Sequence, residues 1–217
     1  MDTLLIVDPM CSWCYGFASE VDAARRLVPG FDPEVVVAGL WAGNRAVLDD
    51  AGKRFRLMHW DKVEAAAGVP FNRDALRARQ GFVYDTEPVS RAFVAGRHCL
   101  PGGDQLRLLR ALQKAFYVDG LDTTAPAVLA DILQAALVAQ GVARTHEALV
   151  QLMDSADIRE ATRQEFERVR AWGYTSVPQL LCREGEGYAL LHSGFANASQ
   201  IASTIAARRD CGLEVTV

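Results

Sequence analysis

The 217-residue sequence predicts an α/β protein in which a large all-helical segment interrupts a small sheet-containing domain. Strand-like apolar runs lie near the two ends of the chain, whereas helical spacing of apolar residues dominates from about 44 to 172. Half of the residues are hydrophobic, which allows a chain of this length to bury roughly 70% of its unfolded surface. One sheet domain with a helical insertion fits both the length and the pattern.

The first forty residues predict the start of a βαβ unit. Residues 3–7, "TLLIV", are typical of a short buried strand. A helix is expected from Ser12 through about Leu27, because Pro29-Gly30 follows as a stop signal. The segment "EVVVAGLW" (34–41) predicts a second strand, and its continuous apolar run favours a sheet covered on both faces.

The middle of the chain predicts helices and no convincing strand. Thr124 is expected to cap a helix that carries Pro126 in its first turn. Roughly 130 residues of mainly helical pattern are too many for one crossover between strands, so most of them should form an inserted domain. The expected helices span 45–67, 72–79, 88–99, 104–118, 125–139 and 146–172, the last with an interruption near Asp154-Ser155.

The end of the chain returns to strands. Residues 177–183 and 188–195 are separated by "EGEG", which predicts a hairpin. A last helix should follow, with Asn197 as N-cap and Gln200 three residues later, as in a capping box. This helix is expected to end near Cys211-Gly212.

The resulting order is β-α-β, a helical insert, a long helix, then β-β-α, which is the order of the thioredoxin fold. We therefore expect a thioredoxin-like domain formed by 1–43 and 173–217 together with the helix near 155–172. Residues 44–154 should form the helical insertion domain.

Two cysteines, Cys11 and Cys14, stand three residues apart where the first strand meets its helix, in "DPMCSWCYG". Residues i and i+3 at the start of a helix lie on nearly the same face, so the two sulfurs can meet. The free N–H groups of the first turn and the helix dipole favour a thiolate at the first sulfur. We expect Cys11 to attack disulfides and Cys14 to resolve the mixed disulfide.

A structural zinc site would need about four ligands, commonly two such pairs. The other cysteines and the four histidines are scattered, so we expect no metal. Cys99, Cys182 and Cys211 are isolated and are expected to act as buried small hydrophobes.

Pro178, in "GYTSVPQLL", opens a strand that otherwise has the pattern of a central one. A missing N–H is tolerated there only at the first residue or at an edge. In a thioredoxin fold this proline is cis and faces the CxxC pair across the active-site groove. The backbone of Val177 would then turn toward the groove, where it could pair with an extended substrate segment.

Four segments together resemble the DsbA-type proteins of the thioredoxin superfamily, in particular the FrnE-like group of predicted protein-disulfide isomerases. They are "DPMCSWCYGF", "YDTEPVSRAFVAGR" (84–97), "QKAFYVDGLDTTAPAVL" (113–129) and "SVPQLL". The resemblance implies thiol–disulfide exchange through Cys11 and Cys14, with Ser12, Trp13 and Val177-Pro178 at the substrate groove. The inner dipeptide Ser12-Trp13 departs from the Pro-His of strongly oxidising periplasmic DsbA, so that enzyme's potential cannot be transferred.

Several other side chains allow two interpretations. Trp13 could offer an aromatic surface to substrate or pack on the insert. Asp8 before Pro9 is expected to start a turn, with a proton acceptor near the cysteines as the alternative. Glu87 and Arg91 suggest an exposed helix pair, and Arg97-His98 a solvated helix face rather than part of the groove. Aromatic residues expected in the core are Phe93, Phe116, Tyr117 and Phe166.

The charge and the N-terminus limit the partners and the compartment. A formal charge of −4 gives no reason to expect nucleic acid or an anionic membrane as partner. No apolar run approaches the ~20 residues of a membrane span, and the N-terminus lacks the basic region of a signal peptide. We therefore expect a cytoplasmic protein with no cofactor beyond its own redox-active pair. Its expected partners are protein thiols and disulfides or glutathione, the latter a candidate reductant.

Two other functions compete with a dithiol–disulfide oxidoreductase. A glutathione-dependent kappa-type transferase, similar to 2-hydroxychromene-2-carboxylate isomerase, has the same fold but typically places Ser where Cys11 stands. A chaperone could use the groove to hold peptides. The presence of both cysteines favours the oxidoreductase, and no GxSxG, HExxH, GxGxxG or P-loop motif supports a hydrolase or nucleotide-binding enzyme.

Overall fold

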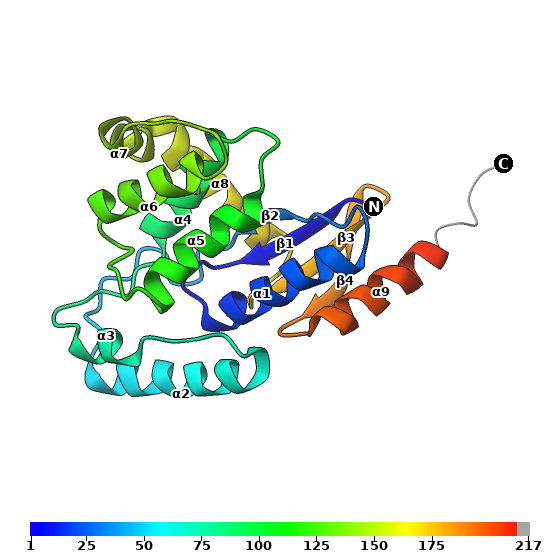
Figure 1. The fold of residues 1–217 in the computed structure, drawn as a ribbon, viewed down its shortest axis with the longest axis horizontal. Coiled ribbons are helices and arrows are strands. Elements are labelled where there is room, and N and C mark those ends of the chain that lie inside the picture. The colour runs from blue at the N-terminus through cyan, green and yellow to red at the C-terminus, as the bar shows by residue number, and fades with distance from the viewer. Residues whose placement is uncertain (212–217) are drawn as a thin grey trace.

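A computed structural model describes residues 1–211, and within them it contains a four-stranded mixed sheet and nine helices (Figure 1). The strand order is β2-β1-β3-β4. Strand β1 (Thr3–Val7) pairs in parallel with β2 (Glu34–Val37) and antiparallel with β3 (Gln179–Glu184), which pairs antiparallel with β4 (Gly187–Ser193). This confirms the predicted α/β class and the βαβ–ββα order.

Both faces of the sheet are covered, as the apolar strand pattern predicted. Leu5 and Val7 of β1 lie in the large core, under α1 (Ser12–Leu27) and α9 (Ala198–Cys211). The alternate residues Leu4 and Ile6 belong to a second cluster with Val169 of α8 (Ala156–Ala171), which packs on β2. Figure 1 shows α1 and α9 side by side along the sheet.

The second strand is shorter than the predicted 34–41. It ends at Val37, and Gly39 adopts a left-handed conformation with φ of +60°. The N–H of Leu40 donates to a carboxylate oxygen of Asp8 at 2.7 Å instead of continuing the sheet. Leu40 and Trp41 are consequently half exposed.

The intervening segment is helical, as predicted. In the part of the chain that the structure describes, its only β-type pairing outside the sheet is an isolated bridge between Val47 and Val83. The break expected near Asp154-Ser155 is present, because the Ser155 hydroxyl caps α8 by accepting from the N–H of Ile158. The helices are α2 (Asp50–Ala67), α3 (Arg73–Ala78), α4 (Glu87–His98), α5 (Gln105–Tyr117), α6 (Pro126–Val138) and α7 (His146–Asp154).

One predicted helix start and one predicted N-cap are wrong. Helix α2 begins at Asp50 rather than 45, because the Asp49 carboxylate caps it by accepting from the N–H of Gly52 at 2.7 Å. Thr124 does not cap α6. Its N–H and its hydroxyl both donate to the Asp122 carboxylate, and the N-cap residue is Ala125.

The last helix begins as predicted. The Asn197 side chain accepts from the N–H of Gln200 at 2.9 Å, and the Gln200 side chain accepts from the N–H of Asn197 at 2.9 Å. This reciprocal pair is the expected capping box. The side chain of Cys211 lies outside the described residues.

The outer edge of β2 is closed by side chains from the insertion and from α8. Val35 donates its N–H to Gln105 and accepts at its carbonyl from Arg97 at 2.8 Å. The N–H of Val37 donates to the Glu165 carboxylate at 2.9 Å, and Glu165 also pairs with Arg97. Unpaired strand edges invite association, and here three side chains satisfy the edge. The predicted solvated role of Arg97 is therefore wrong.

The pair Glu87–Arg91 is also less exposed than predicted. Only 11% of the Arg91 side chain is exposed, and it bonds to Glu87 at 2.8 Å and to the carbonyl of Met153. The core predictions for the four aromatic residues are confirmed, since all are at most 7% exposed: Phe93, Phe116, Tyr117 and Phe166. Cys99 and Cys182 are buried, as expected.

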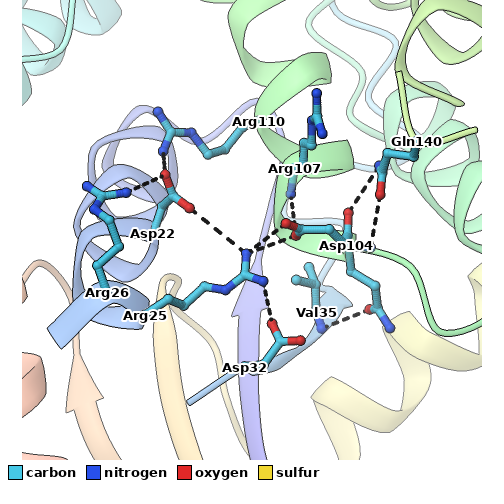
Figure 2. A network of polar contacts seen from close by, with 10 residues as sticks. Asp22, Arg25, Arg26, Asp32, Val35, Asp104, Arg107, Arg110 and Gln140 are labelled. Atoms are coloured by element: carbon cyan, nitrogen blue, oxygen red, sulfur yellow. Dashed lines mark hydrogen bonds and ion pairs between the residues drawn. The ribbon is translucent and has the colours of Figure 1, made fainter. Parts of the chain in front are cut away.

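A polar network fastens the C-terminal half of α1 to the insertion (Figure 2). Arg25 donates to both carboxylate oxygens of Asp104, at 2.9 and 3.0 Å. Asp104 also caps α5 through the N–H of Arg107, while Asp22 pairs with Arg110 at 2.6 Å. The large core runs from the sheet into the insertion without a gap. The division into domains 1–43 with 173–217 and 44–154 stays a prediction.

Candidate active site

The loop between β1 and α1 places the two cysteines one turn apart. Cys11 is the N-cap residue of α1, with an extended backbone (φ −83°, ψ 119°) and no side-chain capping bond. Its N–H donates to the carbonyl of Asp8 at 3.0 Å, and its carbonyl accepts from Tyr15 in the first helical bond. The Cys11 sulfur is therefore left free at the positive end of the helix dipole.

The two thiols have different environments. Cys11 is partly exposed, whereas Cys14 is completely buried, and both are free thiols. Burial and the neighbouring Cys11 raise the pKa of the Cys14 thiol well above its usual value. The backbone N–H of Asp8 donates to Sγ of Cys14 at 3.5 Å. An outside reagent can thus reach Cys11 but not Cys14.

The loop before β3 lies next to the cysteine loop, because the end of β1 pairs with the start of β3 at Ile6 and Gln179. The Val177–Pro178 peptide bond is cis, and Pro178 is buried immediately before β3. The Cys11 thiol approaches the carbonyl of Val177, with 4.0 Å between Sγ and the oxygen. The chain segments predicted to meet, 11–14 and 177–178, are therefore neighbours.

A cavity of about 350 Å³ opens beside Cys11. Helix α1, the loop after β2, helix α2 and the loop before β3 all contribute to its walls. Three predicted substrate-groove residues, Ser12, Trp13 and Val177, line it, and Pro178 lies just behind Val177. The full lining is Met10, Cys11, Ser12, Trp13, Leu40, Trp41, Phe55, Arg56, His59, Trp60, Tyr84, Thr175, Ser176 and Val177.

Trp13 packs on the insertion, as one interpretation of its sequence position expected, and it also lines the cavity. Its indole N–H donates to Nδ1 of His59 in α2 at 3.3 Å, and its ring lies 6.1 Å from that of Phe195. The same side chain lines the cavity. Burial and the charge of Lys62 lower the pKa of His59 below its usual 6.5, so its ring is neutral at pH 7.

Asp8 is fully buried directly beneath the cysteine loop. Its carboxylate accepts from the N–H of Met10 at 2.9 Å, which is the predicted turn, and from the N–H of Leu40 at 2.7 Å. Burial is the main cause that raises the pKa of Asp8 to about 6. The turn role and a titratable group beside the thiols therefore occur together in one residue.

Sequence reasoning missed the cavity wall contributed by the insertion. Tyr84 is buried, donates its hydroxyl to the carbonyl of Met10, and has its pKa raised by burial. Arg56 of α2 lies over the Tyr84 ring, 3.8 Å from its centroid. Helical periodicity places Phe55, Arg56 and His59 on α2, but no local pattern shows that α2 faces Cys11.

Within the described residues, no group of three or more His, Cys, Asp or Glu side chains could hold a metal ion. None of the helices described is long and apolar enough to cross a membrane.

No protein-family model matches the chain, and no curated protein matches it. Solved structures do match. A protein from Nitrosomonas europaea, provisionally assigned as a protein disulfide isomerase, is 28% identical, with 96% of this chain and 97% of that chain covered and a TM-score of 0.81. The cytosolic disulfide reductase DsbM from Pseudomonas aeruginosa is 21% identical, with 100% of both chains covered and a TM-score of 0.73.

A 2-hydroxychromene-2-carboxylate isomerase also shares the fold, at 11% identity, 99% and 100% coverage and a TM-score of 0.62. The expected resemblance to DsbA-type proteins of the thioredoxin superfamily is confirmed. The chain has a DsbA-type thioredoxin fold with a helical insertion.

Proposed function

We propose that the protein is a thiol–disulfide oxidoreductase that exchanges two electrons through Cys11 and Cys14. The observation that carries this proposal is the asymmetry of the pair: a partly exposed thiol at the N-terminus of α1 lies directly above a buried one. The protein from Nitrosomonas europaea, as a provisionally assigned disulfide isomerase, supports the same chemistry.

The reaction proceeds in two displacements. The Cys11 thiolate attacks one sulfur of a disulfide, so a mixed disulfide forms on Cys11 and one thiolate leaves. Cys14 then attacks the Cys11 sulfur, releases the second thiol and closes the Cys11–Cys14 disulfide. The substrate gains two electrons and the protein loses two. The reverse sequence oxidises a dithiol.

The second displacement needs a proton acceptor, because burial keeps Cys14 protonated at neutral pH. Asp8 is the neighbouring acid: its backbone N–H donates to the Cys14 sulfur, and its charge contributes to the raised pKa of Cys14. With a pKa of about 6, its carboxyl group is ionised at pH 7. It can therefore take the Cys14 proton as the new disulfide forms. The Val177 carbonyl, 4.0 Å from the Cys11 sulfur, is placed to accept a hydrogen bond from an incoming chain.

Glutathione or a protein thiol would complete the cycle. DsbM has also been solved with GSH, which supports a glutathione partner, and its description as cytosolic agrees with the expected compartment. A glutathione-dependent isomerase, similar to the 2-hydroxychromene-2-carboxylate isomerase, is the second candidate. A free cysteine pair favours the oxidoreductase, since that alternative activates glutathione's thiol rather than its own.

The test is equilibration of the purified protein in glutathione redox buffers, with the Cys11–Cys14 state followed by alkylation and mass spectrometry. We expect one two-electron transition. A potential near about −270 mV would indicate a reductase and one near about −120 mV an oxidase. A protein with no Cys11–Cys14 transition at any buffer ratio, yet with isomerase activity dependent on glutathione, would establish the second candidate instead.

A further inference from the structure

We propose that Arg56 binds a carboxylate of the substrate, so that the cavity beside Cys11 selects small anionic disulfides. This inference rests on the proposed function and names the substrate class of the same site.

Apart from the Cys11 thiolate that attacks, the cavity has one charged side chain among its lining residues, Arg56. Its walls contain no Asp, Glu or Lys, and His59 is neutral at pH 7 because burial lowers its pKa. Arg56 therefore sets the sign of the charge that a ligand meets next to the Cys11 sulfur.

Arg56 is held in place without a carboxylate partner. No acidic side chain in the part of the chain described forms an ion pair with it, and its one hydrogen bond runs to the carbonyl of Gly52 at 3.4 Å. Its guanidinium stacks on Tyr84 at 3.8 Å and lies 5.6 Å from the Trp41 ring. A guanidinium has five N–H donors, so most remain available to a ligand.

Two other arginines that reach the core behave differently. Arg91 pairs with Glu87, and Arg97 pairs with Glu165 and donates to the carbonyl of Val35. Partly buried cations normally find such partners, because desolvation of an unpaired charge is costly. A stacked, partly buried Arg56 with free donors is suited to a carboxylate from outside, which it can hold in two parallel hydrogen bonds.

The dimensions favour a small molecule. A volume of about 350 Å³ lies at the lower end of the range for small-ligand sites, about 300–1,000 Å³. Apolar walls come from Trp41, Phe55 and Trp60, while Ser12 and Ser176 add hydroxyls near the sulfur. The cavity is therefore suited to a short organic disulfide with an anionic end and an apolar body.

The proposed step is balanced without any further reagent. Reduced protein attacks R–S–S–R, where R carries the carboxylate, and two R–SH form while the Cys11–Cys14 disulfide closes. Single turnover with pre-reduced protein therefore measures the preference directly.

The test compares three disulfides of similar size. They are 3,3′-dithiodipropionate (anionic), bis(2-hydroxyethyl) disulfide (neutral) and cystamine (cationic), each rate being divided by its rate with dithiothreitol. We expect the anionic disulfide to react at least about tenfold faster than the neutral one, with cystamine the slowest. The preference should shrink in 0.5 M salt.

The variants then assign the preference to one side chain. Arg56→Gln should lower the anionic-to-neutral rate ratio to about one, and Arg56→Lys should retain part of the wild-type preference. Arg54→Gln, on the exposed side of the same helix, is the matched control and should leave the ratio unchanged. Because a ratio is measured, partial loss of folded protein cancels.

Contrary outcomes separate the two proposals. If the neutral disulfide reacts in a Cys11-dependent way but the ratio is the same in wild type and Arg56→Gln, the inference about Arg56 fails and the oxidoreductase stands. If a protein disulfide such as insulin reacts faster than dithiodipropionate and is insensitive to Arg56→Gln, the small-substrate assignment fails. No Cys11-dependent exchange with any disulfide would remove the proposed function itself.

Discussion

The backbone N–H of Asp8 lies 3.5 Å from Sγ of Cys14, so a buried acid and a buried thiol share one site beneath Cys11. Neither group contacts solvent, and the negative charge of Asp8 adds to burial in raising the pKa of the Cys14 thiol. A single negative charge can therefore pass between them during disulfide formation.

The first prediction concerns this proton transfer. Asp8→Asn should slow the closing of the Cys11–Cys14 disulfide by about tenfold or more, because the proton acceptor is lost. The wild-type rate of this step should show an inflection near pH 6, where Asp8 ionises, and the variant should lack it. Stopped-flow release of the second thiolate from a chromogenic aromatic disulfide measures the step.

The exposed carboxylate of Asp2 supplies the control, since Asp2→Asn should leave the rate of release of the second thiolate, the second kinetic phase, unchanged. Loss of the Asp8 charge also makes Cys14 easier to ionise. A second phase as fast as wild type, or faster, in Asp8→Asn would mean that this charge effect dominates, and the acceptor role would be rejected.

A second prediction follows for stability. The folded pKa of Asp8 is about 6, above its unfolded value near 3.8, so the folded state binds more protons between these values. The Asp8 contribution to the free energy of unfolding is then most favourable below about pH 4 and is lost as pH rises through 6. The loss is about 3 kcal/mol at most. In urea unfolding from pH 4 to 8, the free energy of unfolding of the wild type should fall relative to that of Asp8→Asn. Parallel plots of this free energy against pH for the two proteins would contradict the prediction.

Thiol accessibility gives a third prediction. Alkylation of the reduced protein at neutral pH, with peptide mapping, should label Cys11 first, because Cys14, Cys99 and Cys182 are buried. Mixed disulfides should accumulate on Cys11 in Cys14→Ser, since the resolving thiol is absent. Insulin reduction should disappear in Cys11→Ser. Early labelling of Cys14 or Cys182 would reverse the assignment of the attacking residue.

The fourth prediction tests the closed edge of β2. Glu165→Ala leaves the partly buried Arg97 and the N–H of Val37 without their partner, so the free energy of unfolding should fall by about 2–3 kcal/mol. Glu165→Gln should cost less, because its amide oxygen can still accept from Val37. Two residues along, Glu167 is half exposed and pairs with Arg163, so Glu167→Ala should cost under about 1 kcal/mol. Equal losses at 165 and 167 in urea unfolding would show that the edge contacts add nothing.

Much of the fold could be predicted because its signals are local. The helix at Ser12–Leu27 begins after a short apolar strand and ends before Pro29-Gly30, and both limits agree with the structure. The capping box at Asn197 and the break at Ser155 could also be predicted, since each depends on side chains within a few residues. A local prediction was wrong where a neighbouring side chain competed for the same hydrogen bond. The hydroxyl of Thr124 donates to Asp122 and does not cap the helix.

By itself the sequence determined the cysteine pair, its place at a strand–helix junction, and the order of elements around it. Periodicity and turn chemistry act over a few residues, and those features need nothing more. Only the tertiary structure decided that Asp8 is buried beside Cys14, that Arg97 and Glu165 close the sheet edge, and that Arg56 reaches the Cys11 cavity. Each of these contacts joins segments that are apart in the sequence and depends on burial and side-chain geometry. A hydrophobic pattern shows which face of an element is apolar, but not which other element packs against that face.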